Sequence, residues 1–153
     1  MKAVGLRETF LSLITSIGAA CAWAGTMTTE PVFHNLEFGN DGKGVVRDVA
    51  VTYGDIRVPA GNAHKVFGPN HMATVTEVRT LPVPENATIE WSSADGQHHE
   101  ATAPMRSLIQ DPNCFHGFRF FFVDDHVDIY LLSRKHDCSK VLDVGRTKVY
   151  TTH

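Results

Sequence analysis

The chain has 153 residues, of which 42% are hydrophobic and 20% charged, and 17 acidic residues outnumber 14 basic ones for a net charge of −3. This length and composition indicate one globular domain and exclude a disordered acidic chain. No apolar run reaches the roughly 18 residues of a membrane-spanning helix, and the absence of a basic excess argues against a nucleic-acid partner.

The first 24 residues have the layout of a secretory signal peptide. Basic residues precede a short apolar stretch, 9–17, and small residues follow it up to Ala22-Trp23-Ala24. An A-x-A sequence is typical of a signal peptidase site, so we predict cleavage before Gly25 and export to the periplasm. Residues 25–153 are then expected to form a single β-rich domain. The alternative, a buried core helix, would lack a polar face.

Cys21 offers a second processing route. The sequence Gly18-Ala19-Ala20-Cys21 approaches the signal of bacterial lipoproteins, but glycine stands where such signals usually have leucine. We therefore favour a protein without a lipid, and a lipid anchor at Cys21 stays as the alternative. Either route leaves Cys114 and Cys138 as an even pair, which we expect to form a disulfide in an oxidising compartment.

The first half of the predicted domain contains several strand patterns. An edge strand is expected around Val32–Phe38, and a glycine-rich turn follows it. Next, 45–53 alternates, with four side chains on one face, Val45, Val49, Val51 and Tyr53, which indicates a half-buried strand. After a turn at Gly54-Asp55, Ile56–Val58 is expected to begin a partner strand.

The segment 59–71 has no hydrophobic period and contains two prolines and two glycines, which indicates a long surface loop. Strands are expected over 73–81 and 87–93, because both segments are rich in residues that favour strands. Asp95-Gly96 then supplies the backbone freedom that a hairpin turn needs, and 98–103 returns as the next strand. One helical turn is expected over 105–110.

The stretch 118–132 has the clearest pattern in the chain. If Asp124-Asp125 forms a two-residue turn, Val123 pairs with His126 and one face of the hairpin contains only apolar side chains, namely Phe118, Phe120, Phe122, Val127, Ile129 and Leu131. The opposite face then contains Arg119, Phe121, Val123, His126, Asp128 and Tyr130. A slip of one residue would mix the two faces, so the apolar pattern fixes the register.

Cys114 and Cys138 bracket this hairpin. The two-residue turn leaves them slightly offset, whereas a wider loop over 124–128 would place them opposite each other and spread aromatic side chains over both faces. Either register allows a bridge after modest bending near Pro112. Closing such a loop stabilises a fold by about 3 kcal/mol in the chain-entropy model.

Short strands, frequent turns and the absence of a sustained helical period predict an all-β fold. The expected architecture is an antiparallel β-sandwich or open barrel, with a C-terminal β-hairpin bracketed by the disulfide.

The nine histidines raise the question of a metal site. His98 and His99 are adjacent, so on a strand they point to opposite faces, and no Cys-x-x-Cys or His-x-x-x-His spacing is present. We therefore expect neither a metal nor a cofactor, although a site assembled in space from His98, Asp124 and His126 stays open. The chain also lacks the G-x-S-x-G, H-E-x-x-H, P-loop and dinucleotide motifs, which favours a protein that is not an enzyme.

The segment 81–99 combines a Leu81-Pro82 opening, a strand with Trp91, a polar turn at Asp95-Gly96 and a return strand. In this it resembles small bacterial periplasmic proteins and lipoproteins, and the hairpin over 118–132 resembles the same group. Some of those families are encoded beside type VI secretion phospholipase effectors and are thought to protect the producing cell as immunity proteins. The resemblance implies a similar protective role here and carries over no functional residue.

The sequence therefore predicts a periplasmic protein that binds and neutralises another protein, such as a toxic effector. The alternative is a small-molecule or cell-envelope binding module with the loop 59–71 over a sheet cleft. An acidic surface suits a basic partner. We expect the contacts to come from loop and hairpin-tip side chains, with six candidates: His64, Phe67, His71, Asp124, Asp125 and His126. Phe67 would suit an interface anchor, but it could equally cap the edge of the sandwich.

Overall fold

The computed structural model describes residues 30–60, 66–135, 138 and 144–152, except for the side chains of 72–79. The predicted signal peptide over 1–24, the lipidation candidate Cys21 and the candidate contact residue His64 lie outside the described residues. None of the helices in the described part of the chain is long and apolar enough to cross a membrane.

Nine strands and one 3-10 turn follow one another in the described chain. They are β1 (Val32–Asn40), β2 (Arg47–Tyr53), β3 (Ile56–Pro59), β4 (His71–Leu81), β5 (Asn86–Ser92), β6 (His98–Pro104), η1 (Arg106–Leu108), β7 (Phe115–Val123), β8 (His126–Arg134) and β9 (Val144–Thr151).

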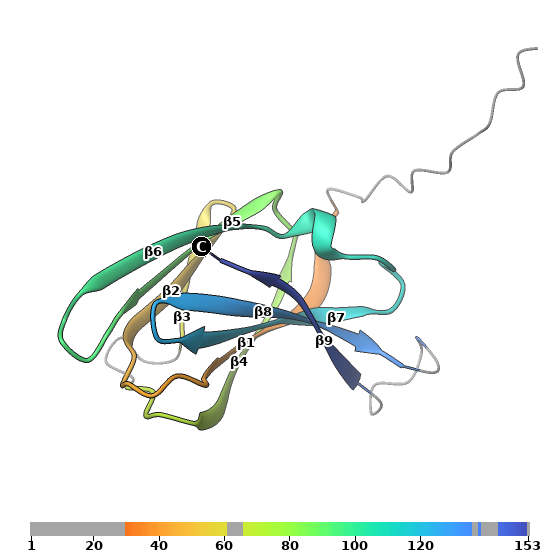
Figure 1. Ribbon diagram of the computed structural model, residues 1–153. Coiled ribbons are helices and arrows are strands. Elements are labelled where there is room, and N and C mark those ends of the chain that lie inside the picture. The colour runs from red at the N-terminus through yellow and green to blue at the C-terminus, as the bar shows by residue number, and fades with distance from the viewer. Residues whose placement is uncertain (1–29, 61–65, 136–137, 139–143, 153) are drawn as a thin grey trace, which may run out of the picture.

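The strands form two sheets that enclose one hydrophobic core (Figure 1). The five-stranded sheet has the order β4-β1-β7-β8-β9, and the four-stranded sheet has the order β3-β2-β5-β6. The predicted all-β sandwich is thus confirmed, with one departure, because β1 and β7 run parallel.

The expectation that β1 is an edge strand was wrong. It lies between β4 and β7, and five of its side chains are buried: His34, Leu36, Glu37, Phe38 and Asn40.

The hairpin of β7 and β8 has the predicted register. Val123 pairs with His126 and Phe120 with Ile129, so the turn consists of Asp124 and Asp125. All six side chains predicted for the inner face belong to the core. Toward the start of β7 the register shifts between Phe115 and Gly117, which marks a β-bulge at His116.

A second bulge explains why one face of β2 was predicted wrongly. Val46 is buried and Val45 only half-buried, the reverse of the simple alternation. The register between β2 and β5 shifts between Arg47 and Ala50, and Asp48 has a positive φ of 53°. Because the extra residue reverses the order of inward and outward side chains, Val46 shares the core face with Val49.

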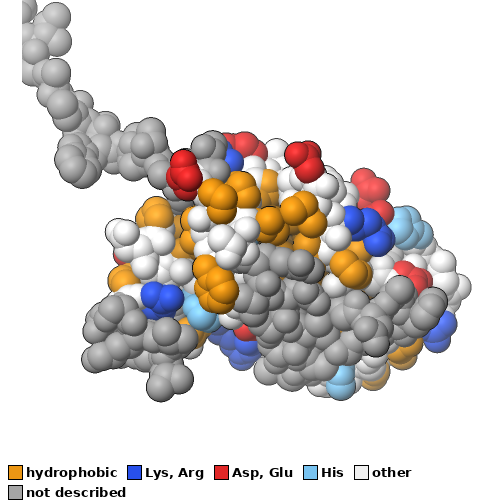
Figure 2. Space-filling view, turned by 180° about the vertical axis from the view of Figure 1, so that it is seen from behind, with side chains coloured by type: hydrophobic (Ala, Val, Ile, Leu, Met, Phe, Trp, Pro, Cys, Tyr) orange, Lys and Arg blue, Asp and Glu red, His pale blue; other side chains and the backbone are white. Residues whose placement is uncertain are grey.

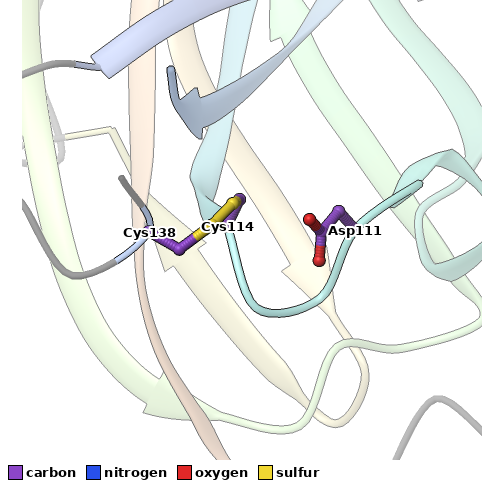
Figure 3. Close-up of side chains that lie close together, drawn as sticks. All are labelled: Asp111, Cys114 and Cys138. Atoms are coloured by element: carbon purple, nitrogen blue, oxygen red, sulfur yellow. A yellow bond between two sulfur atoms is a disulfide. The ribbon is translucent and has the colours of Figure 1, made fainter. Parts of the chain in front are cut away.

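The disulfide between Cys114 and Cys138 is present, with the two Cα atoms 4.6 Å apart (Figure 3). Beyond the bulge at His116, Cys114 lies opposite the end of β8, since the Arg134 N–H donates to the Cys114 carbonyl oxygen at 3.0 Å. The Arg134 guanidinium also donates to the Cys138 carbonyl oxygen. The bulge does not remove the offset expected from the two-residue turn, because it pairs Cys114 with Arg134 in place of Lys135 and so leaves Cys138 four residues further along the chain.

Few large hydrophobic side chains are exposed in the described part of the chain, namely Phe33, Ile56 and Val66. Hydrophobic side chains gather over part of the face seen in Figure 2, which is turned away from the viewer in Figure 1. Exposed apolar residues are normal on protein surfaces, and we assign no function to this group.

Candidate functional site

A cavity of about 320 Å³ lies at one end of the sandwich, where three loops meet. These loops are the segment before β2, the β5–β6 turn and the β7–β8 turn, all at the left end of the view in Figure 1. We call this cavity and its rim the tip surface; it is lined by Gly44, Val45, Val46, Ser93, Ala94, Asp95, Gln97, His99, Asp124 and Asp125.

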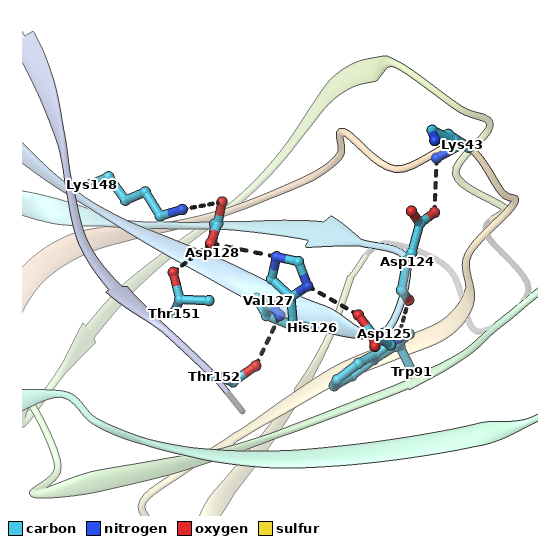
Figure 4. A network of polar contacts seen from close by, with 10 residues as sticks. All are labelled: Lys43, Trp91, Asp124, Asp125, His126, Val127, Asp128, Lys148, Thr151 and Thr152. Carbon is cyan, nitrogen blue, oxygen red and sulfur yellow. Dashed lines mark hydrogen bonds and ion pairs between the residues drawn. The ribbon is translucent and has the colours of Figure 1, made fainter.

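Asp124 joins the β7–β8 turn to its surroundings. Its positive φ of 53° is a conformation that aspartate tolerates better than most residues. Its Oδ1 accepts a hydrogen bond from the Lys43 N–H at 2.9 Å, and its carbonyl oxygen accepts a long one from Trp91 Nε1 at 3.5 Å (Figure 4). Asp124 therefore holds the turn against both the β1–β2 loop and the opposite sheet.

Asn40 fixes the loops behind the cavity and was not predicted from the sequence. Its buried Nδ2 lies 2.8 Å from the Gly44 carbonyl oxygen and 3.0 Å from those of Phe67 and Gly68. Its Oδ1 accepts the Gly42 N–H at 2.9 Å. One side chain thus satisfies backbone groups of two separate loops, as buried polar groups require.

Phe67 is fully buried, so it caps the edge of the sandwich and does not project as an interface anchor. Its backbone exchanges two hydrogen bonds with Val46, at 2.8 and 3.0 Å. Because Val46 lines the cavity, Phe67 supports the tip surface from inside. This corrects the expectation of a contact residue at this position: the loop that contains Phe67 pairs with the segment before β2, which the local sequence does not reveal.

Two exposed carboxylates at the tip surface have lowered pKa values. The hydroxyl of Ser93 and the Gln97 N–H donate to Asp95 and lower the pKa of its carboxyl. A hydrogen bond from His126 Nδ1, at 3.1 Å, lowers the pKa of Asp125 in the same way. Both carboxylates are therefore ionised at neutral pH, and no lysine or arginine is among the described residues that line the cavity.

The β5–β6 turn contributes the aromatic wall. As predicted, glycine supplies the positive φ, 85° at Gly96, and the Gly96 N–H donates to the Ser93 carbonyl oxygen at 3.0 Å. The His99 ring stacks on Trp91 with centroids 5.0 Å apart and an angle of 10° between the planes. His99 Nε2 lies 3.2 Å from the Ser93 hydroxyl, so the imidazole has a fixed position at the cavity.

His126 lies beside the tip surface but does not line it. Its Nε2 is 3.9 Å from a carboxylate oxygen of Asp128, on the side of β8 that faces β9 (Figure 4). Asp128 accepts hydrogen bonds from Lys148 at 2.6 Å and from Thr151 at 2.7 Å. Burial raises the pKa of Asp128, but these hydrogen bonds outweigh it and keep the pKa below its ordinary value. This network stabilises the pairing of β8 with β9.

The six predicted contact residues thus do not form one surface. Asp124 and Asp125 line the cavity, and His126 is next to them. His71 is exposed at the start of β4, where its ring contacts Phe67 with centroids 6.5 Å apart. The missed residues Asp95 and His99 had no local signal, because only the fold places the β5–β6 turn next to the β7–β8 turn.

Two groups of side chains that could bind a metal ion lie close together among the described residues. Asp111 lies near Cys114 and Cys138, but the two sulfurs are bonded to each other (Figure 3). Glu90, His98 and Glu100 form the second group, and Arg57 already pairs with Glu90 at 2.9 Å. The combination that the sequence left open, His98 with Asp124 and His126, is not one of the groups found among the described residues.

The fold and the tip surface define an all-β, disulfide-bonded two-sheet protein with an acidic cavity at its loop end. No family model, curated protein or solved structure matches the chain.

Proposed function

We propose that this protein is a non-enzymatic periplasmic binding protein that neutralises a secreted toxic effector through the tip surface. The observation that carries the proposal is the convergence of three carboxylates, those of Asp95, Asp124 and Asp125, on one cavity between loops. Asp95 and Asp125 are exposed and lie outside the hydrophobic core. Side chains that the fold does not need are the ones available for recognition.

The chemistry of the cavity favours a basic group of the partner. Ionised Asp95 and Asp125 attract a lysine or arginine side chain, while Val45, Val46 and the stacked His99 offer surface for its apolar stem. The cavity of about 320 Å³ is large enough for one such side chain. Complementary charge also speeds the encounter of the two proteins.

The proposal is tested by growth protection. A candidate effector is first sought among the genes that flank this one; it is then exported to the periplasm of a susceptible bacterium, with and without this protein, and survival is measured. We expect the wild type to protect the cells and Asp125→Lys to abolish protection, because a like charge repels the basic group of the effector. The Asp125 side chain is 85% exposed, so the free energy of unfolding should change by no more than about 0.5 kcal/mol.

Asp55→Lys is the matched control. Asp55 is also an exposed turn aspartate, two residues after Tyr53. The Tyr53 ring contacts His34 near the start of β1, whereas the tip surface lies beyond the end of β1, so Asp55 is far from the tip surface. This variant should protect as well as the wild type. Failure of the wild type to protect, or equal loss of protection in both variants, would contradict the proposal.

A further inference from the structure

A second cavity, of about 640 Å³, lies on the outer face of the five-stranded sheet and is distinct from the tip surface. It lies where β8 ends and β9 begins, at the opposite end of the hairpin from Asp124 and Asp125 (Figure 1). Among the described residues that line it, four side chains are of basic type, His116, Arg119, Lys135 and Arg146, and one, Glu37, is a carboxylate. We call it the basic cavity.

Glu37 does not neutralise the basic cavity, because Arg119 already pairs with it. Arg119 Nε donates to Glu37 Oε2 at 2.6 Å, and a second guanidinium nitrogen lies 2.5 Å from the same oxygen. Lys135 and Arg146 have no such partner among the described residues. Within the part of the chain that the structure describes, the Arg146 guanidinium contacts the Tyr130 ring, with its Cζ 6.0 Å from the ring centroid. Neither of these positive charges is therefore paired with a carboxylate of the described residues, in a chain whose net charge is −3.

Glycines shape the walls of the basic cavity. A Cβ at Gly145 would lie 2.6 Å from Lys135 Cε and 2.9 Å from its Cγ, so the stem of Lys135 lies across the bare backbone. This contact limits where the ammonium group can go. On the opposite wall, the bulge before Gly117 displaces His116, and His116 Nε2 lies 3.0 Å from Asn35 Nδ2.

His116 adds a hydrogen-bond donor without adding charge. Burial, together with the nearby Arg134, lowers the pKa of its imidazole, so the ring is neutral at pH 7. Since the Asn35 amide nitrogen is a donor, Nε2 accepts and the ring proton is on Nδ1. The basic cavity thus combines two cations that pair with no described carboxylate, one neutral donor, and the Arg119 guanidinium, which Glu37 holds.

We propose that the basic cavity binds a small molecule with two or more oxyanion groups, carboxylates or phosphates, held chiefly by Lys135 and Arg146. Arginine and lysine are the side chains that bind such groups in proteins. A volume of about 640 Å³ is in the range of small-molecule sites and exceeds what a single inorganic ion needs. This site does not depend on the proposed role of the tip surface.

The test is isothermal titration of the purified chain with citrate and, separately, with pyrophosphate at low ionic strength and pH 7. We expect saturable binding of at least one anion at one site per chain. Arg146→Gln and Lys135→Gln should each weaken it by about tenfold or more, because each removes a charge-assisted contact. Both side chains are exposed, so both variants should keep the melting temperature of the wild type. Tighter binding of citrate than of pyrophosphate, or the reverse, identifies the preferred oxyanion.

Arg57→Gln is the control for general electrostatics. Arg57 lies on β3 of the other sheet and pairs with Glu90, and its loss should change the affinity less than twofold. Binding that weakens equally in Arg57→Gln would show diffuse attraction to positive charge and overturn the site. Absence of saturable binding for both anions would overturn it as well.

Discussion

Replacing Phe67 with alanine should lower the free energy of unfolding by about 3–5 kcal/mol, the range for truncating a buried phenylalanine. Phe67 is fully buried, and its backbone pairs with Val46 through two hydrogen bonds. The cavity left by the ring would therefore disturb the core and the wall of the tip surface together. Urea unfolding followed by tryptophan fluorescence measures the change, because Trp91 is also buried in the core.

The neighbouring Val66→Ala is the control for this prediction. Val66 is 49% exposed, so its truncation should cost less than about 1 kcal/mol. If Phe67→Ala is as stable as Val66→Ala, Phe67 does not have the buried position described here, and its role as an interface residue would return.

The second large effect is expected for Gly117→Ala, with a loss of about 3 kcal/mol or more. An added Cβ would lie 2.2 Å from the Asn35 carbonyl oxygen and 2.8 Å from the Asn35 nitrogen, and Gly117 has a φ of 156°. Backbone atoms of a paired strand cannot move away easily, so overpacking and backbone strain add. The parallel pairing of β1 with β7 should suffer first, because Asn35 and Gly117 are partners in it.

Gly44→Ala separates this close contact from a general effect of removing glycine. Nothing lies within 4 Å of a Cβ at Gly44, so we expect its stability to stay within about 1 kcal/mol of the wild type. Equal midpoints of urea unfolding for the two variants would contradict the close approach of β1 and β7.

The hairpin of β7 and β8 could be predicted because its evidence is local. Alternating apolar residues on both arms allow only one register, and the two aspartates are left for the turn. The disulfide was predicted because Cys114 and Cys138 are the two cysteines left once Cys21 is removed or lipidated. The strand β9 was not predicted, since Val144–Thr151 is largely polar and only half-buried or exposed over most of its length. Its position depends on pairing with β8, which no local pattern encodes.

Long-range pairing also explains what was missed in the candidate site. Asp124 and Asp125 were found because polar residues at a hairpin tip are visible in the sequence. Asp95 and His99 join them only because the β5–β6 hairpin ends beside the β7–β8 turn. Val46 is buried in place of Val45 because of a bulge in the pairing of β2 with β5. Phe67 is buried because its backbone pairs with Val46.

The most direct measurement of the proposed binding surface is photo-crosslinking in cells that also produce the candidate effector of the protection test. A photoreactive amino acid is placed at Ala94, which is exposed and lines the cavity, and in a separate variant at Asp55, near the start of β1. We predict a covalent adduct with the effector from position 94 and none from position 55. An adduct from position 55 alone, or protected cells with no adduct from position 94, would contradict binding through the tip surface.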